Sequence, residues 1–179
     1  MKVTRIGPSQ AQEAPAPSQG RDRLGSLYES QSSAATRLAY VLTGDVEAAQ
    51  DIAQEAFVRV GRKLFGLRDP ELSRAYLYRT VVNLCRGRAR RLKIERATLH
   101  KLNNHHRRQD PDITERDEMW RALLLLPVRQ RTVLFLRYYQ DLSETQAAEV
   151  LDCSVAAIKS LVHRGLKELR LRFEGASDD

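Results

Sequence analysis

Apolar residues recur along this 179-residue chain at intervals of three and four. No stretch keeps the alternation of two that a half-buried strand requires, so the spacing predicts an all-α protein. Leucine- and alanine-rich segments with helical spacing predict helices at 24–42, 46–64, 71–92, 114–126, 128–139, 143–150 and 154–173.

Glycine and proline stand where the apolar pattern restarts. The motifs LTGD at 42–45 and FGLRDP at 65–70 interrupt it, and Pro127 breaks an otherwise continuous run of leucines. Few large apolar residues occur at 93–112, which indicates a linker. The sequence therefore predicts two small helical domains, at 22–92 and 113–174, joined by a flexible linker at 93–112 and flanked by disordered tails at 1–21 and 175–179.

The positive charge of the chain is concentrated in one place. The net charge is +7 and the pI is about 9.7, which favours a polyanionic partner, either nucleic acid or an acidic membrane surface. Nine of the basic residues lie between Arg86 and Arg108 against one acid, Glu95. Between Gly44 and Ala56 there are four acids and no base, so a second surface suits a positively charged partner.

Several classes of protein are disfavoured by what the sequence lacks. Cys85 and Cys153 do not suggest a disulfide framework, and we see neither a membrane span nor a signal peptide, so we expect a cytoplasmic protein without membrane insertion. There is no phosphate-binding glycine loop and no nucleophile motif, which makes an enzyme improbable. No metal site or cofactor is expected, because no acid or cysteine completes a ligand set with the histidines, His100, His105, His106 and His163.

The segment 143–171 has the layout of two helices joined by a tight turn. Ser143 with a glutamine three residues later forms a capping-box signature, and Ser154 is placed to cap the second helix. This layout is typical of a helix-turn-helix, whose second helix enters the DNA major groove. A helical hairpin whose exposed face is merely basic is the alternative. The second helix has an apolar stripe, Val155, Ile158, Val162, Leu166 and Leu169, opposite small or basic residues, Ala156, Ser160, His163, Arg164 and Lys167.

The predicted helix at 71–92 carries a basic strip. Three guanidinium groups and an amide on one face suit phosphates and base edges. A solvated face is the alternative, although no acid lies on the strip to pair with the arginines. Tyr76 and Tyr78 nearby are expected either to stack on an unpaired base or, as is commoner, to pack in the core. The inner face is Leu77, Val81, Leu84 and Leu92, and the strip is Arg79, Asn83, Arg86 and Arg90.

The acidic residues belong to the predicted helix at 46–64. Its inner face holds Ile52, Ala56, Val60 and Leu64, with Phe57 beside them. Asp51 and Glu55 are four residues apart and share a face, and Arg59 follows at the next step. This group is either an intrahelical pair or a docking surface for a basic partner.

Three stretches together, DIAQEAFVRV (51–60), AYLYRTVVNLCRGRARR (75–91) and the segment 126–170, strongly resemble the bacterial sigma-70 family of RNA polymerase sigma factors. The resemblance is to the extracytoplasmic-function (ECF) subgroup, which retains only domains 2 and 4, and within it to the SigE-like actinobacterial type. It covers about Leu24 to Phe173 in the expected order.

The resemblance implies a role in promoter-specific transcription initiation. It implies docking on the β′ clamp helices and the β flap of core RNA polymerase, and leaves an anti-sigma factor as a possible partner. The linker would thread toward the RNA exit path, and the loop at 65–70 would help to open the −10 element. The implied contacts are Asp51, Gln54, Glu55 and Phe57 for core polymerase; Arg79, Asn83, Arg86 and Arg90 for −10 DNA; and Ser154, Ala156, Lys159, Ser160, His163, Arg164 and Lys167 for −35 DNA.

Two positions depart from the family pattern. Gly87 stands where members often have aspartate, and Asp152 stands where they often have glycine in the turn. Because aspartate tolerates a left-handed conformation better than most residues, we expect the turn to survive. An autonomous DNA-binding repressor or activator is a further alternative, but it leaves the surfaces at 51–60 and 79–90 without a role.

Overall fold

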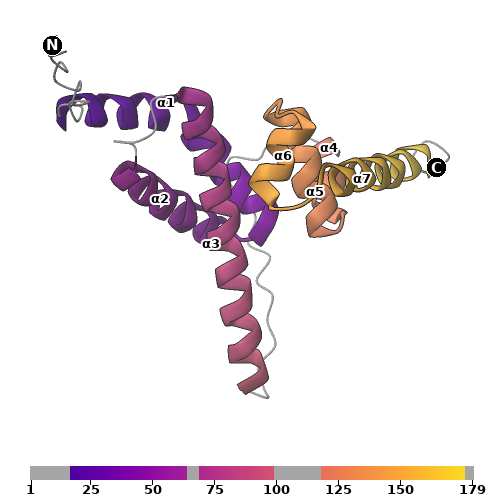
Figure 1. The fold of residues 1–179 in the computed structure, drawn as a ribbon. Coiled ribbons are helices and arrows are strands. Elements are labelled where there is room, and N and C mark those ends of the chain that lie inside the picture. The colour runs from indigo at the N-terminus through magenta and orange to yellow at the C-terminus, as the bar shows by residue number, and fades with distance from the viewer. Residues whose placement is uncertain (1–16, 64–68, 99–117, 176–179) are drawn as a thin grey trace, which may run out of the picture.

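A computed structural model describes residues 17–63, 69–98 and 118–175, and no β-strand occurs in any of these ranges (Figure 1). The all-α prediction is confirmed. In chain order the elements are α1 (Pro17–Thr43), α2 (Val46–Lys63), α3 (Pro70–Thr98), α4 (Glu118–Leu125), α5 (Val128–Leu134), the π-helical turn η2 (Phe135–Tyr139), α6 (Glu144–Leu151) and α7 (Val155–Gly175).

Three boundaries differ from the prediction. α1 begins at Pro17, inside the segment expected to be a disordered tail, and proline suits the first position of a helix. α3 continues through Thr98, past the expected start of the linker at residue 93. The helix predicted at 128–139 is α-helical in α5 and then widens into the π-helical turn η2, where the Gln140 N–H donates to the Phe135 oxygen at 3.2 Å. The remaining predicted tails, the linker from residue 99 and most of the loop at 65–70 lie outside the described residues.

The first unit consists of α1 to α3, and the buried face of α2 is rich in alanine. Gly44 has a φ of +68° and turns the chain, and the Asp45 carboxylate then accepts the Ala48 N–H at 3.1 Å to start α2. Small side chains allow α1 and α3 to lie close to α2. The buried residues of α2 are Ala48, Ala49, Ile52, Ala53, Ala56, Phe57 and Val60.

The second unit, α4 to α7, is organised by a close contact and an aromatic cluster. At Gly165 in α7 an added Cβ would lie 2.9 Å from Leu134 Cδ1, so glycine allows α5 and α7 to approach. The π-helical turn stacks Phe135 on Tyr139, with ring centroids 5.6 Å apart, and Trp120 meets both rings edge-on. α7 packs on α5, and α6 packs on α7 and on the π-helical turn.

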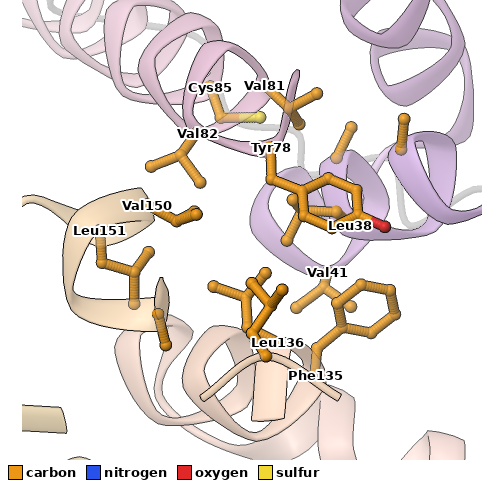
Figure 2. Packing of buried hydrophobic residues seen from close by; sticks show 14 of the residues in the cluster. Leu38, Val41, Tyr78, Val81, Val82, Cys85, Phe135, Leu136, Val150 and Leu151 are labelled. Atoms are coloured by element: carbon orange, nitrogen blue, oxygen red, sulfur yellow. The ribbon is translucent and has the colours of Figure 1, made fainter. Parts of the chain in front are cut away.

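The two units share one buried core (Figure 2). α3 packs on α6 and α1 packs on α5, so residues predicted to lie in separate domains meet. Within the described ranges, no helix is long and apolar enough to cross a membrane. The side chains that meet at this junction are Leu38, Val41, Tyr78, Val81, Val82 and Cys85 from the first unit, and Phe135, Leu136, Val150 and Leu151 from the second.

Candidate nucleic-acid interface

The helix-turn-helix predicted at 143–171 is present as α6 and α7. Ser143 and Gln146 form the capping box in both directions, with bonds of 3.1 and 2.8 Å, and Ser154 Oγ accepts the Ala157 N–H at 3.2 Å. Both predicted caps are confirmed. Asp152 ends α6 with a φ of +53°, so the predicted survival of the turn without glycine is also confirmed.

The polar face of α7 is open to solvent. All seven residues expected to contact the −35 element are exposed along α7, which extends away from the first unit (Figure 1). Lys159 lies 3.6 Å from the Glu144 carboxylate, but both side chains are solvated and such a pair contributes little. The exposed residues are Ser154, Ala156, Lys159, Ser160, His163, Arg164 and Lys167.

The apolar stripe of α7 is only partly buried. Ile158 and Leu169 lie in the core, whereas Val155 and Leu166 are 36% and 41% exposed. The sequence placed all of them on the inner face. That prediction is wrong for Val155, at the first turn of α7, and for Leu166. Gly165 faces Leu134 of α5, so the neighbouring Leu166 lies at the edge of the contact between the two helices.

The basic strip of α3 is also exposed, although one of its arginines contacts the second unit. Arg79, Asn83 and Arg90 are open to solvent, and the C-terminal part of α3 projects beyond the other helices (Figure 1). Arg86 is exposed as well, but its Nη2 donates to the backbone oxygen of Leu151 in α6 at 2.6 Å. Leu92, predicted to face inward, is 36% exposed, because it lies on the projecting part of α3.

The two tyrosines near the strip have different surroundings. Tyr78 is fully buried, which excludes it from stacking on a base and confirms core packing as its role. Its hydroxyl donates to the Gln31 amide oxygen at 2.6 Å and contacts Gln140. Burial raises the pKa of Tyr78 to about 12, although the Arg74 guanidinium opposes the shift. Tyr76 is half-buried, with the Lys63 ammonium 5.5 Å from its ring centroid.

The acidic face of α2 is exposed. Asp51, Gln54 and Glu55 point to solvent, and Glu55 also accepts a hydrogen bond from Arg59 at 2.7 Å. The intrahelical pair is therefore present, but the face stays accessible because an exposed pair of this kind is weak. Phe57 does not belong to this surface. It is buried against Tyr28, with ring centroids 5.0 Å apart, so it supports α2 from inside.

Sequence reasoning missed the polar contacts between the units. The guanidinium groups of Arg86 and Arg131 each reach a backbone oxygen in the opposite unit. Arg74 Nη1 also lies 3.5 Å from the Gln140 oxygen. The spacing of residue types in the sequence does not predict such contacts, because their acceptors are backbone oxygens of residues distant in sequence.

Comparison with known proteins agrees with this arrangement. Residues 27–94 match the family model "Sigma-70 region 2", and residues 116–169 match "Sigma-70, region 4". The first match covers most of α1 to α3, and the second covers α4 to α7 up to Leu169. The strip on α3 thus lies in region 2, and the helix-turn-helix lies in region 4.

Similar proteins of known sequence or structure belong to the same group. The chain is 32% identical to the RNA polymerase sigma-E factor of Streptomyces avermitilis, over 80% of each chain. It is 30% identical to the ECF RNA polymerase sigma factor SigW of Bacillus subtilis, over 75% of this chain and 80% of that one. The fold is similar to the sigma factor RpoE in its complex with the anti-sigma factor NepR from Bartonella quintana, with a TM-score of 0.69 and 19% identity, covering 88% of this chain and 95% of that one. The chain therefore belongs to the sigma-70 family of RNA polymerase sigma factors, within its ECF group, whose regions 2 and 4 bind core polymerase and recognise the −10 and −35 promoter elements.

Proposed function

We propose that the two exposed surfaces of this sigma factor divide promoter recognition between them. Arg79, Asn83, Arg86 and Arg90 of α3 contact the −10 element, and the polar face of α7 contacts the −35 duplex. The observation that carries the proposal is the exposure of Arg79, Asn83 and Arg90 on one face of α3. Neither Arg79 nor Arg90 forms an ion pair with an acid in the part of the chain that the structure describes, and such guanidinium groups suit phosphates and base edges.

The contacts on α7 follow from its exposed side chains. Small residues at its N-terminal end, Ser154, Ala156 and Ser160, permit close approach to the major groove, and the longer Lys159, His163 and Arg164 reach bases or phosphates. Lys167 and Arg170 lie further along and suit phosphate or polymerase. The exposure of this face of α7 supports this part of the proposal.

We assign polymerase docking to the acidic face of α2. Asp51, Gln54 and Glu55 would meet the β′ clamp helices, with Phe57 holding α2 in place from the core. Region 4 would meet the β flap. Catalysis then belongs to the polymerase, this chain has no active site of its own, and it acts in the cytoplasm. An anti-sigma factor is a further partner that suits the group.

The test is a binding and transcription assay with purified core polymerase. Asp51→Arg should weaken core binding, because it reverses the charge that the partner meets. Asp22→Arg makes the same charge change on an exposed position of α1 and should leave binding unchanged. If the wild-type chain fails to bind core, or fails to start promoter-specific transcription with it, the proposal is wrong.

The two DNA surfaces can be separated with promoter templates. Arg90→Ala should abolish opening of the −10 region while core binding persists. Arg164→Ala should weaken promoters that depend on the −35 element and spare an artificial bubble template that is already open. Equal losses of both variants on both templates would contradict the division of roles.

A further inference from the structure

A cavity of about 330 Å³ lies between α1, α3 and the π-helical turn. This volume is within the range of sites that bind small molecules. None of the residues that line it belongs to the surfaces that we assign to DNA or polymerase. Most of the side chains around it are polar, so it suits a polar ligand. They include Gln31, Ser33, Arg37, Arg74, Gln140 and Asp141.

Arg37 of α1 is the cation of this cavity that can accept a ligand. Its side chain is exposed, and it forms no hydrogen bond or ion pair in the part of the chain that the structure describes. Arg74 is engaged, because its Nη2 donates to the Glu71 carboxylate at 2.9 Å and its Nη1 lies 3.5 Å from the Gln140 oxygen. A guanidinium group binds two oxygens of a phosphate at once, so Arg37 suits a phosphate.

Two neutral groups of α1 line the same cavity. Ser33 precedes Arg37 by four residues and therefore lies on the same face of α1. Its side chain is exposed, and its hydroxyl has no hydrogen-bond partner among the described residues. The Gln31 Oε1 atom accepts the Tyr78 hydroxyl at 2.6 Å, which leaves the Gln31 amide nitrogen as a donor. Both groups add donors for phosphate oxygens to the charge of Arg37.

Asp141 brings a negative charge to the cavity. It follows the π-helical turn, is exposed, and pairs with no cation in the described ranges. Repulsion from its carboxylate disfavours a small anion that lies close to it. Hydroxyl groups, in contrast, donate hydrogen bonds to a carboxylate, as ribose hydroxyl groups do in dinucleotide sites. The cavity therefore suits a ligand that carries a phosphate at one end and hydroxyl groups further along.

Tyr139 adds an aromatic surface to the cavity. It is 42% exposed, and its ring is stacked on the buried Phe135 with centroids 5.6 Å apart and planes 10° apart. This stacking holds the Tyr139 ring in one orientation. Nucleobases stack on exposed aromatic rings, whichever base they are. A phosphate, hydroxyl groups and a flat ring are together the parts of a nucleotide.

We propose that this cavity binds a ribonucleoside monophosphate. The phosphate lies on Arg37 and Ser33. The ribose hydroxyl groups donate to Asp141, and the base stacks on Tyr139. The site is separate from promoter recognition, because no residue of the DNA or polymerase surfaces takes part in it.

The test is isothermal titration calorimetry on the full chain at about 0.15 M salt, where long-range attraction of anions to the exposed basic strip is screened. AMP, GMP, CMP and UMP are titrated beside ribose 5-phosphate and inorganic phosphate. At least one nucleotide should bind at one site per chain. It should bind at least about fivefold more tightly than ribose 5-phosphate or inorganic phosphate, because neither of these has a base to stack.

Variants of two arginines on α1 test the phosphate contact with the tightest nucleotide. Arg37→Ala should weaken binding at least about tenfold, the effect of losing a charge-assisted hydrogen bond. Arg37→Lys keeps the charge without the planar fork and should weaken binding less. Arg21→Ala removes the same charge from an exposed site outside the cavity and should change the affinity less than about twofold. Circular dichroism verifies that the variants are folded.

Asp141→Asn tests the ribose contact. It should weaken binding of the nucleotide and reduce its advantage over the 2′-deoxy form. Binding of inorganic phosphate should not weaken, because a repelling charge is removed. Asparagine tolerates the left-handed backbone of this position, where φ is +50°, so the turn is kept.

The cavity is excluded as a nucleotide site if no nucleotide saturates the protein at about 10 mM, or if ribose 5-phosphate binds as tightly as the best nucleotide. Equal effects of Arg37→Ala and Arg21→Ala exclude it as well. Arg90→Ala, on the strip of α3, should leave the affinity within about twofold of the wild type. A loss equal to that of Arg37→Ala would place the nucleotide on the strip and overturn the proposal.

Discussion

Arg131 and Val41 lie ninety residues apart in sequence and are joined by a hydrogen bond of 2.5 Å from Nε to the backbone oxygen. The Nη1 atom of the same guanidinium donates to the Leu124 oxygen at 2.7 Å. One side chain therefore caps the C-terminal turns of both α1 and α4. Burial lowers the pKa of Arg131, and the Tyr40 hydroxyl partly offsets the shift. The cost of burying this cation is offset by two carbonyl groups that would otherwise lack a partner.

Arg131→Ala is expected to destabilise the whole molecule. It leaves two helix-terminal carbonyl groups without a donor, which costs about 2 to 4 kcal/mol in the free energy of unfolding. For a chain of this size the melting temperature should fall by roughly 5 to 15 °C. Arg129→Ala, an exposed neighbour on α5, should change it by about 1 or 2 °C at most. Thermal unfolding followed by circular dichroism measures both, and equal melting temperatures would contradict the role of Arg131 as a cap.

The raised pKa of Tyr78 predicts that the folded protein loses stability at alkaline pH. Burial raises its pKa from 10.0 to about 12 in the folded protein. The unfolded chain therefore releases this proton near pH 10, while the folded protein keeps it until about pH 12. Stability from Tyr78 is fully present below pH 10 and is lost as the pH rises toward 12. Urea unfolding at pH 8 to 11 should show the decline.

Tyr78→Phe provides the control for this pH dependence. It removes the titrating hydroxyl and keeps the ring, so its stability should fall less steeply above pH 10 than that of the wild type. The variant should also be less stable at pH 8, by about 1 kcal/mol, because the contacts to Gln31 and Gln140 are lost. Parallel curves for the two proteins between pH 9 and 11 would rule out the raised pKa.

The predictable part of the structure is what each helix encodes locally. The capping box at Ser143 and the cap at Ser154 were both predicted from residues nearby in sequence. The survival of the turn at Asp152 was predicted from the resemblance to the family, whose members often have glycine there. Apolar spacing placed the helices, because it records which face of each one is buried. Leu92 was predicted wrongly, since spacing does not reveal where a helix projects beyond its neighbours.

The junction between the units was beyond sequence reasoning. The contacts of Arg86 and Arg131 end on backbone oxygens, which every residue has, so no residue type marks the partner. The residues of the π-helical turn at 135–139 do not distinguish it from an α-helix, yet this turn places Gln140 against Tyr78. The exposure of Arg79, Asn83 and Arg90 was expected from their residue types, whereas the contact of Arg86 with the Leu151 oxygen required coordinates.

The two cysteines are expected to differ sharply in reactivity. Cys85 is 5% exposed, and burial raises the pKa of its thiol to about 12, with Arg88 opposing the shift. Cys153 is half-buried in the turn before α7. Because the thiolate is the reactive form, Ellman's reagent at pH 8 should modify Cys153 first and Cys85 only on opening or unfolding. Cys153→Ser should leave no rapidly reacting thiol in the folded protein, and two equally fast thiols in the wild type would contradict the burial of Cys85.

Gly87 and Gly165 both lie inside helices, and substitution by alanine is expected to change the stability of the fold in opposite directions at the two positions. At Gly87 no atom of the described residues lies within 4 Å of an added Cβ, so Gly87→Ala should stabilise the fold by about 1 kcal/mol. At Gly165 the Cβ would lie 2.9 Å from Leu134 Cδ1, and Leu134 is buried, so Gly165→Ala should destabilise it by about 1 to 3 kcal/mol. Urea unfolding of both variants measures the contrast.

Gly87 also lies inside the strip that we propose binds −10 DNA, between Arg86 and Arg90, where close approach of DNA is the remaining reason for a glycine. Gly87→Ala should therefore be more stable and yet less active in promoter opening with core polymerase, because its methyl group would meet the DNA rather than the protein. Gly165→Ala, assayed well below its melting temperature, should retain promoter opening, since it changes only the packing of α5 on α7. A Gly87→Ala protein that is both more stable and fully active would show that this glycine serves neither the fold nor DNA binding.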